Sequence, residues 1–169
     1  MIVTFHYSKK ISGFVKGSEL IMWAEEEDFS HCATEIQVDP ELDGIVYEAV
    51  YPKSRKLPKQ EWLKHSQPVH SIPFLVTDPV LKKAIIFDLE SNLDKDYSIF
   101  QLFIIGVGLC FKLVAKAVDK IVINSNKFLI CSEYQSLPLK RLGAKFEEPS
   151  DSIDITECFE QAKKLKGIE

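Results

Sequence analysis

Two short alternating segments joined by a turn signal limit the folds open to this chain more than any other feature of its sequence. Residues 31–38 (HCATEIQV) alternate between two sets of side chains, as a strand with two different faces does. Residues 45–50 (IVYEAV) are typical of a second strand, and Asp43-Gly44 between the two segments is a turn signal. Together they predict an antiparallel hairpin.

Other elements are predicted around this hairpin. Residues 69–77 and 120–124 are further strand candidates, because each is a short run rich in apolar and β-branched residues. Helices are predicted over residues 12–25, 58–65, 79–93, 98–116, 125–138 and 155–166, the third of them capped by Asp78 with Pro79 at its first position. Because strands and helices form separate groups along the chain, the sequence predicts an α+β fold with an antiparallel sheet packed against helices.

Length and composition limit the kind of protein further. With 169 residues, 46% of them hydrophobic and 27% charged, we expect one globular domain over residues 1–169. The net charge is −4 and no basic run exceeds two residues, which argues against nucleic acid as a partner. The four cysteines show neither CxxC spacing nor nearby histidines at metal-ligand intervals, so we expect no metal, no cofactor and no disulfide scaffold.

The start of the chain and one apolar stretch bear on localisation. The first residues lack the basic and then apolar pattern of a secretory signal, so we expect a cytoplasmic protein with free thiols. Residues 99–118 form the most apolar stretch, but Gln101, Lys112 and Lys116 interrupt it. Its unbroken apolar core is about half of the ~20 residues that a membrane-spanning helix needs. We therefore predict a buried helix there, with membrane attachment as the alternative.

Cys131 is the first candidate for a reactive group. A cysteine nucleophile needs a thiolate, a histidine within hydrogen-bond reach and a polar group that orients the imidazole. Cys131 lies near the beginning of a predicted helix, whose N-terminal N–H groups would stabilise a thiolate. His31 begins the first strand of the hairpin and Glu48 lies on the second. These three residues could therefore form a catalytic set.

Each of them also has an ordinary structural interpretation. A cysteine in the apolar context FLIC is commonly a small buried hydrophobe, His31 could be a satisfied structural residue, and Glu48 could be a surface charge. Three other histidines compete for the role of base: His6, His65 and His70. Cys32 would face away from His31 on its strand, and Cys110 and Cys158 are expected to be packing residues.

The hairpin allows the His31–Glu48 pair to be checked crudely. If the two strands pair through the loop 39–44, residues whose numbers add to a constant lie opposite one another. His31 opposite Glu48 gives a sum of 79 and puts Asp39 and Pro40 at the tip. The hairpin thus permits the pair without requiring it.

Four motifs follow one another along most of the chain: FSHCATEI, VYEA, DYSIFQLFIIGVG and FLICSEY. In this order the chain resembles the circularly permuted papain-like enzymes, the YiiX-type branch of the NlpC-like cell-wall peptidase superfamily, distantly similar to lecithin:retinol acyltransferase. In that branch a Ser-His strand precedes the cysteine, and the cysteine precedes Ser-Glu, as at His31 and Cys131 here. The resemblance implies a permuted papain-like fold with Cys131 as nucleophile, His31 as base and Glu48 as the group that orients the imidazole.

The activity that this resemblance implies is hydrolysis of an amide bond in a peptide or a cell-wall-like substrate. Backbone N–H groups near Cys131 would bind the oxyanion, and a hydroxyl from Tyr7, Tyr47 or Tyr134 could assist. Two other functions stay open. One is a thiol acyltransferase or lipid esterase acting on an acyl substrate, which the apolar stretch 99–118 motivates, and the other is a binding module without turnover.

Overall fold

The five strands of the main sheet form an antiparallel array in the order β4–β3–β2–β1–β5. The computed structural model describes residues 1–11, 22, 27–39, 41–97, 128–146 and 153–168. The strands of this sheet are β1 (Ile2–Lys10), β2 (His31–Gln37), β3 (Ile45–Glu48), β4 (Arg55–Pro58) and β5 (Ser66–Leu75). The helices in the described part are α2 (Lys59–Trp62), α3 (Pro79–Glu90), α6 (Cys131–Arg141) and α7 (Ile155–Lys166). The predicted α+β class with an antiparallel sheet is therefore confirmed.

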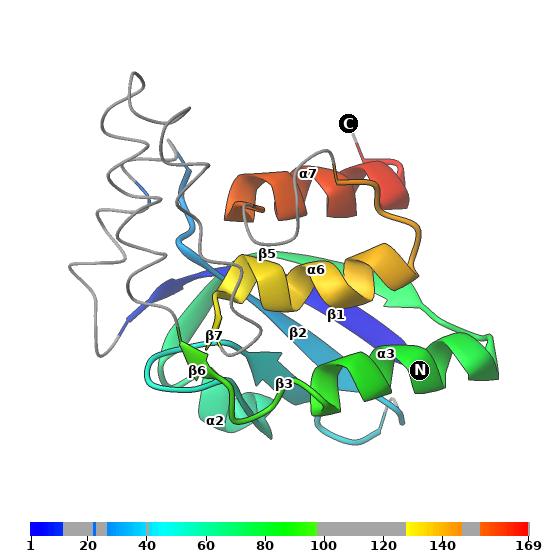
Figure 1. Cartoon of the computed structure of the whole chain (residues 1–169), viewed down its shortest axis with the longest axis horizontal. Helices are drawn as coiled ribbons and strands as arrows, with labels where there is room; N and C mark the ends of the chain where they lie inside the picture. Colours follow the sequence, from blue (N-terminus) through cyan, green and yellow to red (C-terminus); the bar gives the residue numbers. More distant parts are fainter. Residues whose placement is uncertain (12–21, 23–26, 40, 98–127, 147–152, 169) are drawn as a thin grey trace.

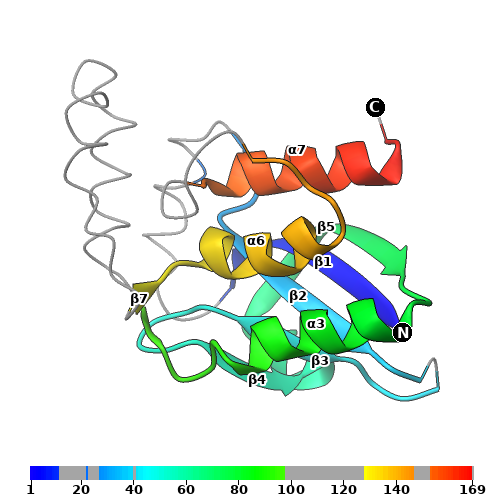
Figure 2. The same ribbon diagram turned by 45° about the vertical axis from the view of Figure 1, so that its right-hand side comes forward.

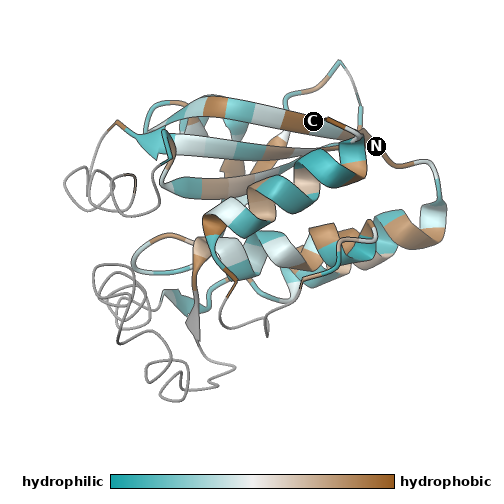
Figure 3. Ribbon diagram, turned by 90° about the horizontal axis from the view of Figure 1, so that it is seen from above, coloured by the Kyte–Doolittle hydropathy of each residue, from teal (hydrophilic) through white to brown (hydrophobic). Residues whose placement is uncertain are grey.

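The sheet separates two layers of packing. Helices α3, α6 and α7 lie over one face, with α6 between the other two (Figures 1 and 2). The main core fills this space and includes Phe5, Tyr7 and Cys32 of the sheet. The short helix α2 packs on the opposite face, where Trp62 contacts Ala33 and Val46. Polar and apolar bands alternate along the strands in Figure 3, as expected for a sheet whose two faces have different partners.

Strand β1 lies between β2 and the edge strand β5 and is not among the strands predicted from the sequence. It pairs with β2 on one side and β5 on the other, so that Phe5 lies between Thr34 and Ile72. Its buried residues include His6 and Ser8 as well as apolar side chains. Polar residues normally lie at the surface, so the sequence pattern of this segment does not indicate a buried strand.

The predicted hairpin is confirmed, with a different register. Thr34 lies opposite Tyr47, so the numbers of paired residues add to 81 rather than 79. A shift of two residues leaves every side chain on the face that the alternation predicts, because the strand period is two. Gly44 has a role beyond the turn. A Cβ atom added there would overlap the Glu35 carboxylate, so the glycine allows that side chain to approach the backbone.

Strand β5 is an edge strand and begins three residues before its predicted start. Its two prolines cannot donate to a ladder, which is tolerated when the proline nitrogen faces away from the neighbouring strand. The Lys166 ammonium donates to the carbonyl oxygen of Pro73 at 2.6 Å from outside the sheet. Backbone groups of Pro73, and of Ser71 two residues earlier, therefore face the outer edge.

Helices α3 and α7 follow the sequence closely. The Asp78 carboxylate accepts hydrogen bonds from the backbone N–H groups of Val80 (2.8 Å) and Leu81 (3.4 Å), and Pro79 is the first helical residue, as predicted. Helix α3 ends at Glu90, three residues before the predicted end. Helix α7 has the predicted bounds.

The helix that carries Cys131 begins later than predicted. Residues Phe128–Leu129 form strand β7, which pairs in parallel with β6 (Asp96–Tyr97), and α6 begins only at Cys131. The Glu133 carboxylate accepts from the N–H group of Ile130 at 2.9 Å, which stabilises a helix start at this point. The helix also runs past the predicted stop at Pro138 to Arg141. A short apolar run such as FLI does not distinguish strand from helix by itself.

Some predictions fall outside the described residues. These are the helices over 12–25 and 98–116, the strand over 120–124, and Cys110. In the part of the chain that the structure describes, no helix combines the length and apolar character needed to cross a membrane.

Candidate active site

Cys131 is the first residue of α6, and its side chain is 3% exposed. Ile130 before it is extended, with φ −107° and ψ 168°, so the chain turns into the helix at the cysteine itself. The first N–H groups of a helix have no partner within the helix and carry a partial positive charge. The thiol therefore lies where a negative charge is stabilised. The sequence predicted a helix start near residue 125, which would have placed Cys131 farther from these N–H groups.

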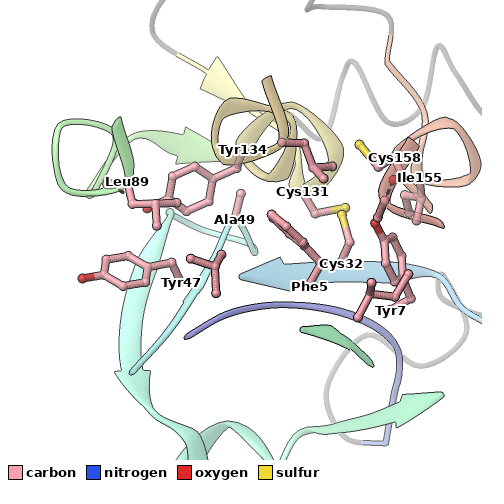
Figure 4. Close-up of a cluster of buried hydrophobic side chains, with 14 of the residues drawn as sticks. Phe5, Tyr7, Cys32, Tyr47, Ala49, Leu89, Cys131, Tyr134, Ile155 and Cys158 are labelled. Atoms are coloured by element: carbon pink, nitrogen blue, oxygen red, sulfur yellow. Dashed lines mark hydrogen bonds between the residues drawn. The ribbon is translucent and has the colours of Figure 1, made fainter. Parts of the chain in front are cut away.

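The Cys131 sulfur has polar partners on β2. Figure 4 shows its side chain facing Cys32 across the space between α6 and the sheet. Hydrogen bonds with the Cys32 side chain and with His31, together with the His31 charge and the Cys32 backbone, hold the pKa of Cys131 well below its usual range. Burial opposes this shift and is outweighed. A lowered pKa increases the share of the reactive thiolate at a given pH.

His31 and Cys131 meet although they belong to different faces of the sheet. By alternation His31 lies on the face covered by α2, and Cys32 lies on the face covered by α6. The ladder between β2 and β3 begins only at Thr34, so the edge of β2 before that residue is open on the β3 side. The residue that interacts with the thiol, His31, therefore lies beyond the part of β2 that pairs with β3.

The other side of the imidazole is held by Glu48. The distance from His31 Nε2 to Glu48 Oε2 is 2.7 Å, and both side chains are buried. An ionised carboxylate can only accept, so Nε2 carries the proton and Nδ1 is the nitrogen assigned to the thiol. Burial and the Lys10 charge act to lower the pKa of His31, but hydrogen bonds with Cys131 and Glu48 outweigh them and raise it.

Glu48 is fully buried and accepts from four side chains. Besides His31, its oxygens lie 3.1 Å from Lys10 Nζ, 3.1 Å from Trp62 Nε1, and 2.9 and 2.6 Å from two nitrogens of Arg55. Burial alone would raise the pKa of Glu48, but the hydrogen bond with His31 and the surrounding positive charges hold it well below its usual range. The possibility of a surface charge is wrong, since this carboxylate is a buried anion with cationic partners.

Tyr97 is a site residue that the sequence analysis missed. It lies at the end of β6, pairs with Leu129 beside the start of α6, and its hydroxyl hydrogen-bonds Cys131. Burial, followed by the Cys131 charge, raises the pKa of Tyr97 well above 10, so the hydroxyl keeps its proton and can donate. Tyr97 is the second residue of the motif DYSIFQLFIIGVG, which is the one sequence signal that could have drawn attention to it.

The three tyrosines proposed from the sequence have other partners. Their hydroxyls donate to the Cys158 carbonyl from Tyr7 (2.8 Å), to Glu90 from Tyr47 (2.6 Å) and to the Leu89 carbonyl from Tyr134 (2.7 Å). Each of these bonds fastens a helix to the sheet or to another helix, so the three hydroxyls contribute to packing.

The competing histidines also lie elsewhere. His65 is 4.0 Å from Glu61, and His70 is 3.4 Å from Asp28. His6 binds Glu35 on the face covered by α2. The structure therefore brings the predicted set Cys131, His31 and Glu48 into one hydrogen-bonded chain.

The other described cysteines differ in their relation to the site. Cys158 is fully buried, its sulfur lies 3.4 Å from the Ser132 carbonyl oxygen, and burial raises the pKa of its thiol well above the usual range. It is a packing residue, as predicted. Cys32 faces away from His31, as the alternation predicts, but it contacts Cys131 and so belongs to the site.

Among the described residues, no three His, Cys, Asp or Glu side chains are grouped so that they could hold a metal ion. What the site offers instead is a thiol of lowered pKa, an imidazole and a buried carboxylate in series, next to a helix start. Compared with known proteins, the chain matches no family and no curated sequence.

Proposed function

We propose that this chain is a cysteine hydrolase of the circularly permuted papain-like (NlpC-like) type, which cleaves an amide bond in a peptide or a cell-wall-like substrate. The observation that carries the proposal is the hydrogen-bonded series Cys131–His31–Glu48 at the start of α6. The order of the elements also supports it, because the strand that bears the histidine precedes the helix that begins at the cysteine.

The chemistry would begin with the thiolate. The Cys131 sulfur attacks the amide carbonyl carbon, and the imidazolium of His31 gives its Nδ1 proton to the departing nitrogen as the C–N bond breaks. The acyl group is then held on sulfur as a thioester. His31, now neutral, takes a proton from water, whose oxygen attacks the thioester and releases the acid and the thiolate.

Glu48 would keep the imidazole in one orientation and one protonation pattern. Its Oε2 atom fixes the proton on Nε2, so that Nδ1 always faces the thiol. The donors Lys10 and Arg55 keep Glu48 ionised and prevent it from taking the proton itself. Glu48 therefore orients and stabilises the imidazolium without entering the proton transfer.

Two groups could stabilise the oxyanion. The N–H groups in the first turn of α6 are directed toward the Cys131 end of the helix, where the carbonyl oxygen of a bound substrate would lie. The Tyr97 hydroxyl keeps its proton and contacts the same sulfur, so it is a second donor. This combination supports acyl transfer to sulfur in preference to passive binding.

The rate of alkylation tests the proposal. Wild-type chain is treated with iodoacetamide at pH 6.5, and the modified cysteines are located by mass spectrometry. Cys131 should react faster than Cys32 and Cys158, and His31→Ala should slow it by about tenfold or more, since the thiolate loses its counter-ion. The matched control is His65→Ala, which changes a half-buried histidine away from the site. Equal alkylation rates for Cys131, Cys32 and Cys158 would contradict the proposal.

Product analysis then decides between hydrolase and acyltransferase or esterase. A peptide amide and a phospholipid ester are offered separately, and release of amine or of fatty acid is followed. We expect Cys131-dependent release from the amide. Release from the ester alone, abolished by Cys131→Ala, would support the lipid alternative, and no release from either, with normal alkylation, would favour a binding module.

A further inference from the structure

A second buried histidine–carboxylate pair lies on the face of the sheet covered by α2. His6 Nε2 is 2.8 Å from Glu35 Oε2, and His6 Nδ1 is 2.8 Å from Ser71 Oγ. His6 and Glu35 are 2% and 3% exposed, whereas Ser71 is exposed to solvent. A serine at the surface is thus connected through a buried imidazole to a buried carboxylate, and the hydrolase proposed above uses none of these three residues.

The Glu35 carboxylate determines which nitrogen of a neutral His6 ring carries the proton. Burial acts to raise the pKa of Glu35, but hydrogen bonds and charges from His6 and Lys59 outweigh it and lower the pKa. The ionised carboxylate requires a proton on His6 Nε2, so in the neutral ring Nδ1 has only a lone pair. The Ser71 hydroxyl must then donate to Nδ1. This is the arrangement in which a histidine can remove a serine proton during attack on a carbonyl group.

The sheet fixes this arrangement rigidly. His6 on β1 and Ser71 on β5 lie directly opposite each other in a non-hydrogen-bonded pair. In antiparallel sheets the side chains of such a pair are closer together than those of a hydrogen-bonded pair. The Trp62 ring covers His6, with centroids 5.1 Å apart and planes at 33°. Lys59 Nζ lies 3.0 Å from the Glu35 carboxylate, which also packs on Gly44. The base and its carboxylate are therefore held by three further residues.

A donor for a developing oxyanion is present at the same place. Lys166 binds the carbonyl oxygen of Pro73 from the outer edge of β5. Backbone groups two residues apart on a strand point to the same side, so the backbone N–H and C=O of Ser71 are also directed to this edge, away from β1. A nucleophile's own N–H is one of the two oxyanion donors in serine proteases. A single donor on an open edge suits esters with good leaving groups, which need less stabilisation than amides.

We propose that Ser71 is a second nucleophile, activated through His6 by Glu35, that accepts an acyl group from small activated esters. In the step, Ser71 Oγ forms a bond to the ester carbonyl carbon while its proton passes to His6 Nδ1. The bond from that carbon to the leaving oxygen then breaks, and Nδ1 returns the proton to this oxygen. The products are an acylated Ser71 and an alcohol. The proposal does not depend on the activity of Cys131.

The test is site-resolved acetylation of the wild-type chain by p-nitrophenyl acetate. Peptide mapping follows the acetyl group on each serine, lysine and cysteine with time. Ser71 should be acetylated about 100-fold faster than Ser91, an exposed serine that donates to the Asp88 carbonyl and has no histidine partner. Ser71→Ala should abolish this adduct, and Ser91→Ala should leave it unchanged. Ser71→Ala removes the partner of the buried His6 Nδ1 and should lower the melting temperature, whereas Ser91→Ala should change it little. The melting temperature of each variant is therefore measured to show that it is folded during the assay.

The outcomes separate this proposal from the cysteine hydrolase. A thioester on Cys131 and an ester on Ser71 occur on different peptides, so each nucleophile is scored by itself in one sample. Acetylation of Ser71 no faster than that of Ser91, or acetyl groups confined to surface lysines, would overturn the proposal and identify the series as a structural polar network. His6→Asn, if it folds, should lower the Ser71 rate to that of Ser91 and leave Cys131 alkylation intact.

Discussion

The α2-covered face of the sheet carries two similar histidine–glutamate pairs in different surroundings. In each pair the histidine places Nε2 against a buried glutamate and leaves Nδ1 for a possible nucleophile: His31 binds Glu48 at 2.7 Å and His6 binds Glu35 at 2.8 Å. Only the first lies at a helix start and at the open end of a strand. The difference between the two sites is therefore the position of the nucleophile, since the imidazole and carboxylate are nearly equivalent.

The carboxylates differ in how they are neutralised. Glu48 has Lys10 and Arg55 as cationic partners in addition to its histidine, whereas Glu35 has one lysine, Lys59, among the described residues. More positive charge around the carboxylate makes the imidazolium less stable, which suits a residue that must give up its Nδ1 proton in each cycle. A buried His–Glu pair therefore supports the nucleophile at both sites, and the helix start at Cys131 favours the His31–Glu48 pair for amide chemistry.

The largest effect should come from removing the charge of Glu48. Glu48→Gln leaves the half-buried Lys10 and the buried His31 beside a neutral amide, so we expect the chain to lose about 3–5 kcal/mol of unfolding free energy. Cys131 alkylation should slow by tenfold or more, because the imidazole loses its orientation. Urea denaturation and iodoacetamide kinetics measure the two effects. The matched variant Glu35→Gln should reduce stability while leaving the alkylation rate near that of wild type, and an equal loss of rate would break the comparison.

The same residue predicts an acid dependence of stability. The pKa of Glu48 is lowered on folding from a reference of 4.5, so its contribution is fully present above that value and is lost as the pH falls through the lower folded pKa. Wild-type unfolding free energy should therefore decrease from about pH 4.5 downward. In Glu48→Gln this decrease should be smaller, as measured by urea denaturation at a series of pH values. Parallel curves for the two proteins would show that the carboxylate is not held as described.

The next effect, of intermediate size, should come from Gly44→Ala. The new Cβ would overlap the Glu35 carboxylate and force it away from His6, so we expect a loss of about 1–3 kcal/mol. Ser71 acetylation should fall, and Cys131 alkylation should stay unchanged. Gly167→Ala is the control, because a Cβ there meets no atom within 4 Å, although its φ of +70° carries some strain. A fall in both reaction rates would mean that the two His–Glu sites are coupled, and the comparison would fail.

The parts of the fold that follow local rules could be predicted from the sequence. The alternation around His31 and the pattern Asp78-Pro79 depend on neighbouring residues, and both are found as predicted. The register of the hairpin differs by two residues, because the loop and not the strands decides where pairing begins. The His31–Glu48 contact survives that shift, since it preserves the faces and the long side chains span the diagonal.

What escaped prediction depends on contacts between distant segments. The start of α6 is set by the pairing of β7 with β6, about 30 residues earlier in the chain, and this pairing also brings Tyr97 to Cys131. Strand β1 is hidden because His6 is a buried polar residue whose partners, Glu35 and Ser71, lie on two different strands. A polar residue that is satisfied over such distances has no local pattern to identify it.

The smallest effect should come from Lys10, whose ammonium is 3.1 Å from Glu48 Oε2. Its charge acts to lower the pKa of His31, so Lys10→Met should raise that pKa further. A proton is needed on His31 for the leaving group, so the alkaline limit of hydrolysis should move to higher pH, by less than about one unit. A pH–rate profile with the amide substrate measures the shift. Lys59→Met removes the corresponding lysine on Glu35 and should leave the profile unchanged. If Lys10→Met moves the alkaline limit to lower pH, the assignment of that limit to His31 is wrong.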